Sequence, residues 1–108
     1  MILVQVFRDN EEINKIEVKG HSGYEEFGKD IVCSAVSTSV ILTVNLLERL
    51  DAKFECKEEA NIPLISLIIN ESNSLIQTIL ENLVDSLNEI SKQYKKYLQI
   101  KTKFWIRR

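Results

Sequence analysis

The chain has 108 residues, the size of one domain, and 44% of them are apolar, which is enough for a hydrophobic core. Its formal net charge of −2 gives no general attraction to nucleic acid or to an anionic membrane. One histidine and two cysteines argue against a disulfide framework and cannot supply the usual four-ligand structural zinc site. We therefore expect neither a metal nor a cofactor.

The first residues, MILVQVFRDN, contain no basic segment and no cleavage site of a signal peptide. No stretch approaches the roughly 18 uninterrupted apolar residues of a membrane span. Two cysteines without a secretion signal favour a reducing compartment, so we expect a cytoplasmic protein without a membrane partner.

The first predicted elements form a hairpin. Residues 2–8 are apolar and β-branched, which predicts a strand with both faces partly covered. Residues 9–12, DNEE, provide turn residues. Residues 13–20 alternate, with Ile16 and Val18 on one face and charged residues on the other, as in a half-buried strand.

All three glycines of the chain lie between Gly20 and Lys29, which indicates an irregular loop. A helix is predicted from Ile31 to about Leu50, with Asp30 in the position of its N-cap. The helix is indicated by apolar residues that recur at helical spacing: Val32, Val36, Val40, Thr43, Leu47 and Leu50.

The second half of the chain repeats the pattern of two strands and a helix. Residues 52–59 alternate, which predicts a strand with Phe54 and Cys56 facing inward, and Cys56 is expected in the core. Residues 61–70 predict a further strand, with Pro63 at its start or on an edge. The next helix follows a cap at Ser72 or Ser74, and residues 98–106 alternate as a closing strand. One apolar stripe defines this second helix: Leu75, Ile76, Ile79, Leu80, Leu83, Leu87, Ile90 and Tyr94.

The predicted order is β-β-α-β-β-α-β, without a linker, so residues 1–108 form a single domain. Two amphipathic helices suffice to cover one face of a sheet. We predict an α+β fold in which a mixed, largely antiparallel sheet of about five strands is covered by two helices.

A possible reactive centre lies where the loop meets the first helix. Cys33 falls in the predicted first turn, where free N–H groups and the helix dipole stabilise a thiolate and a developing oxyanion. A return of the loop can bring His21 near the sulfur as its base. Asp30 can orient His21 or bind a substrate amine, and Ser37 lies one turn after Cys33 on the same face. Each of these residues alone is more often structural, so the hypothesis depends on the cluster.

The cluster resembles a known family. The segments GHS at residues 20–22 and GKDIVCSAVS at residues 28–37 are similar to the signature of the ribosomal-processing cysteine proteases, the Prp peptidases. That signature is a Gly-His before a small residue, a glycine-bearing loop and then Gly-x-Asp-(Ile/Val)-Val-Cys-(Ala/Ser)-Ala-(Val/Ile)-Ser. The size and the predicted element order are similar to those of the family over essentially the whole chain.

The resemblance implies a specific activity. Family members remove a short N-terminal extension from the large-subunit ribosomal protein numbered twenty-seven, cutting after a Phe-rich segment and before a small residue. It implies Cys33 as the nucleophile and His21 as the general base, with Asp30 and Ser37 at supporting positions. It also implies a homodimer, whose partner is the extended ribosomal protein.

The loop between Ser22 and Lys29 flanks the active site in this family. Tyr24 and Phe27 are its large apolar side chains, and we expect them to close over the Phe-rich segment of the substrate. The loop residues expected to bind substrate are Gly20, Ser22, Gly23, Tyr24, Phe27 and Gly28.

Two other functions fit the same residues. The C-terminal segment KTKFWIRR mixes basic and aromatic residues, which is compatible with an RNA-binding module. Solvated charges on a closing strand are the simpler interpretation, and no direct nucleic-acid partner is expected. Another thiol enzyme, such as an amidase or acyl transferase, would use the same Cys33 and His21 pair.

Overall fold

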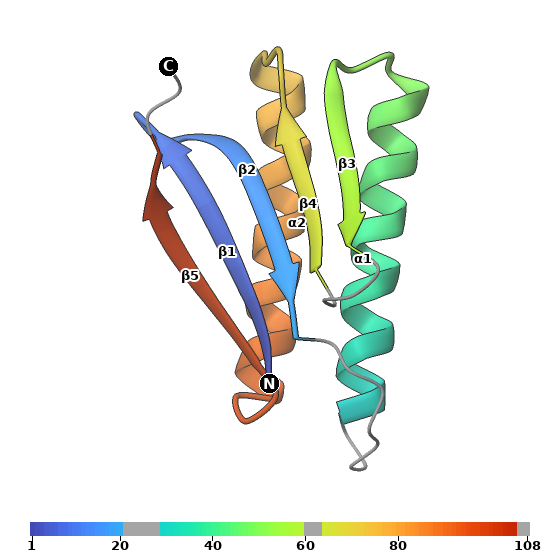
Figure 1. The fold of residues 1–108 in the computed structure, drawn as a ribbon, viewed down its shortest axis with the longest axis vertical. Helices are drawn as coiled ribbons and strands as arrows, with labels where there is room; N and C mark the ends of the chain where they lie inside the picture. Colours follow the sequence, from blue (N-terminus) through green and yellow to red (C-terminus); the bar gives the residue numbers. More distant parts are fainter. Residues whose placement is uncertain (21–28, 60–63, 106–108) are drawn as a thin grey trace.

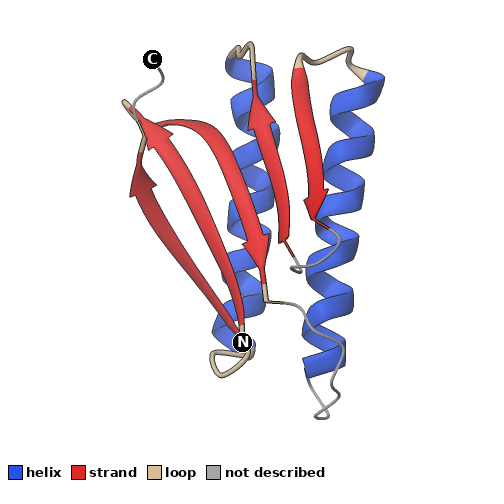
Figure 2. Ribbon diagram, viewed as in Figure 1, coloured by secondary structure: helices blue, strands red, loops and turns tan. Residues whose placement is uncertain are grey.

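A computed structural model describes residues 1–20, 29–59 and 64–105 of the chain. Five strands form one sheet in the order β3-β4-β2-β1-β5, and both helices lie on the same face of it (Figures 1 and 2). The predicted α+β class and element order are thus confirmed. The elements are β1 (Ile2–Asp9), β2 (Glu12–Lys19), α1 (Lys29–Arg49), β3 (Phe54–Glu59), β4 (Leu64–Ile69), α2 (Ser74–Gln93) and β5 (Leu98–Phe104).

The sheet is mixed because β5 joins it parallel to β1, whereas the other neighbouring strands are antiparallel. The predicted β1–β2 hairpin forms, and its two turn residues, Asn10 and Glu11, have φ angles of 48° and 71°. Positive φ at both turn residues matches the right-handed twist of the flanking strands. The register shifts between Phe7 and Arg8, which marks a bulge close to this turn.

The core lies between the sheet and the helices. Alternate residues of β1, namely Ile2, Val4 and Val6, are fully buried, as expected for a strand with one face against helices. Helix α1 contributes one face and α2 its apolar stripe. The helical core residues are Val32, Val36, Val40, Leu47, Ile76, Leu80, Leu83, Val84 and Leu87.

Several predicted boundaries differ from the structure. The N-cap of α2 is Asn73, whose side chain accepts a hydrogen bond from the Ile76 N–H at 2.9 Å, and not Ser72 or Ser74. Leu50 and Leu75 are exposed rather than part of the helical stripes. Strand β3 begins at Phe54 rather than at residue 52, and β4 ends at Ile69 rather than at residue 70, while the predicted ends at residues 61–63 and 106 lie outside the described part of the chain.

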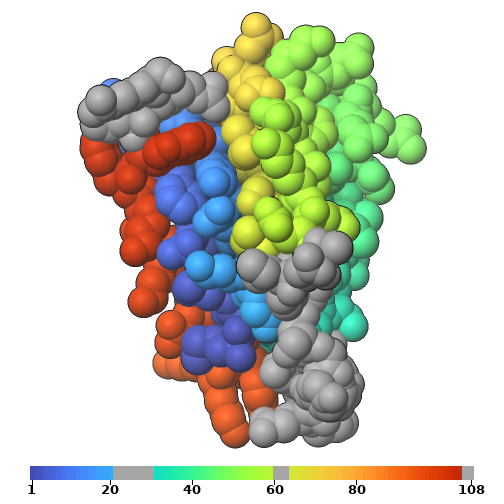
Figure 3. Space-filling view, in the orientation of Figure 1, coloured from blue at the N-terminus to red at the C-terminus, as the bar shows by residue number. Residues whose placement is uncertain are grey.

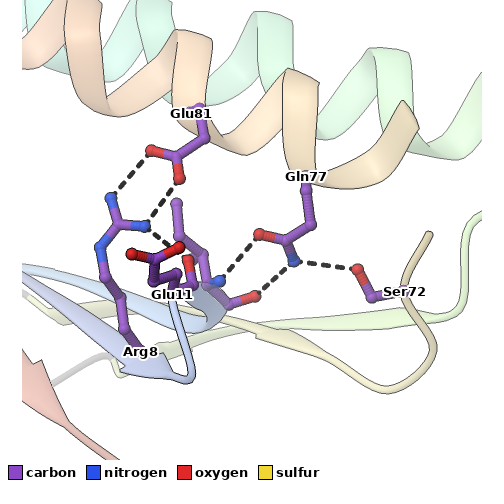
Figure 4. Close-up of polar contacts among 6 residues, drawn as sticks. Arg8, Glu11, Ser72, Gln77 and Glu81 are labelled. Carbon is purple, nitrogen blue, oxygen red and sulfur yellow. Dashed lines mark hydrogen bonds and ion pairs between the residues drawn. The ribbon is translucent and has the colours of Figure 1, made fainter. Parts of the chain in front are cut away.

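Polar contacts attach the hairpin to α2 (Figure 4). The amide of Gln77 accepts a hydrogen bond from the Ile13 N–H at 2.8 Å and donates one to the Ile13 carbonyl at 2.9 Å. Arg8 binds the carboxylate of Glu81 through two hydrogen bonds, of 2.7 and 2.8 Å. This hydrogen-bonded guanidinium lowers the pKa of Glu81, although partial burial opposes the shift.

Helix α1 is more apolar than its role in the core requires. Residues 31–49 are long and apolar enough to cross a membrane by length and mean hydropathy alone, a test that an apolar core helix also passes. In the fold, one face of this helix packs under the sheet, and the opposite side leaves large apolar residues such as Ile41, Leu42 and Leu46 exposed. These residues are available for contacts beyond the single chain.

Candidate active site

Strand β2 ends at a glycine whose geometry explains the residue type. Gly20 has a φ of +90°, and a Cβ atom there would lie 2.5 Å from the carbonyl oxygen of Met1. Any other L-residue would be both strained and in collision with fixed backbone. Gly20, expected to bind substrate, therefore has a structural reason to be glycine: it allows the chain to pass Met1 as it leaves the sheet.

Most of the predicted loop residues lie outside the described part of the chain. These are His21, Ser22, Gly23, Tyr24, Phe27 and Gly28. The side chain of Asp30 is not described either. The pairing of His21 with Cys33 and the closure of Tyr24 and Phe27 over a substrate therefore remain predictions.

Helix α1 begins two residues earlier than predicted. It starts at Lys29, so Asp30 lies within the first turn and is not the N-cap. Cys33 is consequently the fifth residue of the helix rather than a member of its first turn. Among the described residues, the N–H groups left without an intrahelical partner are those of residues 29–31. Because Cα–Cβ bonds tilt toward the helix N-terminus, the Cys33 side chain still extends toward those groups.

Cys33 is a free cysteine of intermediate exposure that packs against the edge of the core. Ser37 follows one turn later and is also partly buried. It lines a groove of about 520 Å³ between α1 and the strands β3 and β4. The structure thus places an accessible thiol and an apolar groove on successive turns of one helix.

The groove is apolar along its floor and acidic at one edge. Its walls contain Val40, Ile41, Val44 and Asn45 of α1, Leu64 and Ile65 of β4, and Cys56, Glu58 and Glu59 of β3. It is open to solvent, since Ile41 and Asn45 are both exposed. A groove of this kind suits a peptide segment with large apolar side chains.

Cys56 is exposed, so the prediction that it belongs to the core is wrong. Strand β3 is at the edge of the sheet. Phe54 packs against the core, whereas Cys56, two residues later on the same side of the strand, lines the open groove. Partial burial raises the pKa of the Cys56 thiol, and the carboxylates of Glu58 and Glu48 raise it further. A thiol in this environment is a poor nucleophile at neutral pH. Among the described residues, no group of three or more His, Cys, Asp or Glu side chains is arranged to hold a metal.

Comparison with known proteins identifies the family. The family model described as "Cysteine protease Prp" matches residues 1–99, almost the whole chain. The chain belongs to the Prp cysteine proteases. A search of curated proteins finds no match.

Solved structures of similar proteins share the fold. One similar structure is the Prp protease of S. aureus, described as an essential ribosomal processing protease in complex with a substrate peptide. It is 23% identical to this chain, with a TM-score of 0.87. The alignment covers 95% of this chain and 100% of that one. The Streptococcus mutans protein SMU.848 is 25% identical, with a TM-score of 0.88 and coverage of 97% and 96%. A second S. aureus Prp structure, described with a covalently linked product peptide, is 24% identical, with a TM-score of 0.84 and coverage of 95% and 100%.

The groove is not apparent from the sequence, which predicts only the thiol of Cys33 and the loop before it. The substrate contacts predicted from the sequence lie in the loop alone, because residues 37–45, 56–59 and 64–65 are brought together only by the fold. One signal was present: Ile41 and Val44 lie beside the predicted core stripe of the helix and make its apolar surface wider than the sheet requires.

Proposed function

We propose that this Prp-family protease removes a short N-terminal extension from a large-subunit ribosomal protein, the one numbered twenty-seven, during ribosome assembly. Family membership and the S. aureus relative described as a ribosomal processing protease support this substrate class. The observation that carries the proposal is the apolar groove, which begins at Ser37, one turn after Cys33.

The dimensions of the groove suit the segment before the cleavage site. Along a helix, Cys33 and Ser37 are about 6 Å apart, and Ser37 and Asn45 about 12 Å. An extended peptide advances about 3.3 Å per residue. When the scissile carbonyl lies at Cys33, the two residues before it in the substrate reach as far as Ser37. About four residues before those extend along the groove. A Phe-rich segment buries its rings there against Val40, Ile41 and Ile65.

The proposed chemistry is acyl transfer through a thioester. The Cys33 thiol gives its proton to His21, and the sulfur attacks the scissile carbonyl carbon. N–H groups of the first turn of α1 stabilise the oxyanion, and His21 then protonates the leaving amine. Water, deprotonated by His21, hydrolyses the thioester and releases the carboxylate, which regenerates the thiol. Asp30 orients the imidazole, and Ser37 hydrogen-bonds within the site.

The loop and the assembly complete the proposal. Tyr24 and Phe27 close over the apolar segment, which gives the loop between residues 22 and 29 its role in substrate binding. The enzyme acts as a homodimer, in which the exposed Leu42 and Leu46 of α1 are covered by the second copy; with Ile79 of α2 they line a shallow depression. A cytoplasmic location suits two free thiols.

A peptide assay tests this function. The substrate is a synthetic peptide with an apolar segment before a small residue. A Phe-Phe pair stands four and five residues before the cut, at the distance of Ile41 from Cys33, and the matched control has Ser-Ser in place of this pair. We expect a single cut after the apolar segment, lost in Cys33→Ala and slowed about 100-fold or more in His21→Ala. Equal cleavage of the Ser-Ser peptide would contradict the role of the groove, and an uncut Phe-Phe peptide would contradict the function.

A further inference from the structure

The face of the sheet opposite the helices is not covered by any described helix or strand. In β1 the fully buried Ile2, Val4 and Val6 point toward the helices, so the residues between them point to the other side. Figure 3 views the molecule from this side. Strand register arranges three rows across this open face, Lys15–Phe7–Lys103, Glu17–Gln5–Lys101 and Lys19–Leu3–Gln99.

Charge on this open face has the opposite sign to the charge of the chain. The chain as a whole carries 14 Lys and Arg against 16 Asp and Glu. The three rows contain four lysines and a single acidic residue, Glu17, which binds Lys15 at 3.1 Å. The same rows continue across β4 to β3, where they add Lys57, Glu55 and Glu59, so the whole face carries five lysines against three carboxylates. Lys19, Lys101 and Lys103 lie on β2 and β5, with at least one strand between them and the carboxylates of β3. Such a surface attracts a polyanion despite the net charge of −2.

Aromatic rings lie at one end of the same face. Phe7 and Trp105 pack edge to face, with ring centroids 6.1 Å apart. The Lys15 ammonium lies 5.4 Å from the Phe7 centroid and 5.8 Å from that of Trp105. The backbone N–H of Trp105 donates a hydrogen bond to the Arg8 carbonyl at 2.9 Å, which holds the backbone of Trp105 beside β1. Rings held next to lysines offer stacking surfaces for nucleobases beside charges for phosphates.

We propose that this open face binds single-stranded RNA. Lys19, Lys101 and Lys103 contact the phosphates, and bases stack at the rings of Phe7 and Trp105. An acidic peptide would use the lysines but would gain nothing from the rings, so the aromatic pair favours RNA. Helix α1 with Cys33 lies on the other side of the sheet, so a bound RNA leaves the thiol and the groove accessible. The site would hold the protease on RNA-containing particles.

The lysine count sets the expected salt dependence. Each phosphate contact with a single strand contributes about −0.7 to the slope of log K against log salt, so three lysines give about −2. Raising salt from about 50 to about 200 mM should therefore weaken binding roughly 20-fold.

The test uses the full chain and an oligouridine of 12 nucleotides. Trp105 is the only tryptophan, so its fluorescence reports on this face directly. We expect RNA to quench the fluorescence, with the salt slope above. Lys101→Gln and Lys103→Gln should each reduce the slope by about 0.7. Lys57→Gln is the matched control, because Lys57 lies on the open side of β3 and is paired with Glu55.

Three results would overturn the proposal: no quenching by RNA, a slope that Lys101→Gln and Lys103→Gln leave unchanged, or equal binding of polyglutamate of matched length. The last result would assign the face to acidic peptides instead. The assay needs no cleavage, so its failure leaves the proposed protease function intact, and a failed cleavage assay leaves RNA binding intact.

Discussion

Ile41 provides the sharpest test of the groove as the substrate site. This residue of α1 lines the groove, and 57% of it is exposed in the free enzyme. A substrate side chain lying on it would bury most of that surface. Replacing Ile41 with alanine removes this contact and preserves the helix, since alanine is the best helix former.

The expected loss of kcat/KM follows from the surface of Ile41 that the substrate can still bury. Burying a whole isoleucine side chain is worth about 1.5–3 kcal/mol, and somewhat more than half of Ile41 remains available to the substrate. Alanine keeps part of the contact, so the net loss is about 1 kcal/mol. This corresponds to about a fivefold fall in kcat/KM, because 1.36 kcal/mol corresponds to a factor of ten.

The assay compares Ile41→Ala with Leu75→Ala. Leu75 is 52% exposed, a similar fraction, but it lies on α2 and away from the groove. We expect kcat/KM for the Phe-Phe peptide to fall for Ile41→Ala alone. Alkylation of Cys33 by iodoacetamide should stay unchanged in both variants, which separates substrate binding from thiol reactivity. Equal kcat/KM values for the two variants would refute the groove as the binding site.

Three further predictions concern pH and backbone geometry. Arg8 holds the pKa of Glu81 below its usual value, so the pair stabilises the fold above the unfolded pKa of about 4.3 and loses this effect as pH falls through the folded pKa. In urea melts, Glu81→Gln should then lower the free energy of unfolding by about 0.5–1 kcal/mol at pH 7, a modest value because the pair is partly exposed. At pH 3 the same substitution should change it by almost nothing. An equal loss at both pH values would be inconsistent with this linkage. In the Cys33→Ala variant, iodoacetamide should modify Cys56 slowly at pH 7 and faster up to and beyond pH 9, because the pKa of the Cys56 thiol is raised. An alkylation rate that levels off below pH 8 would refute this. Gly20→Ala should cost about 1–3 kcal/mol in the same melts, since the new Cβ meets the Met1 carbonyl, and wild-type stability would contradict the observed backbone geometry.

Local periodicity was sufficient to predict the fold. The alternation of Ile16 and Val18 and the stripe through Leu80, Leu83 and Leu87 each identified the buried face correctly. These patterns are set by the 2.0 and 3.6 residue repeats of strand and helix, which do not depend on distant partners. The class, the element order and the covered face of the sheet therefore follow from the sequence.

Features that depend on neighbours in space were harder to predict. Three residues in a row, Ser72, Asn73 and Ser74, are all good caps, and the backbone selects Asn73. Alternation showed which way Cys56 points but not that β3 is an edge strand whose inward side is only partly covered. The groove and the lysine rows each combine segments that are distant in sequence, so only the folded chain reveals them.

In the proposed function, Cys33 is the nucleophile that cuts an N-terminal extension from a ribosomal protein. The most direct measurement is the intact mass of the extended large-subunit protein numbered twenty-seven after incubation with the wild-type enzyme, with Cys33→Ser and with Cys56→Ser. We predict that the wild type and Cys56→Ser remove one N-terminal peptide, and that Cys33→Ser leaves the substrate mass unchanged while retaining the wild-type melting temperature. Cleavage by Cys33→Ser, or an unchanged substrate mass with the wild type, would contradict the account.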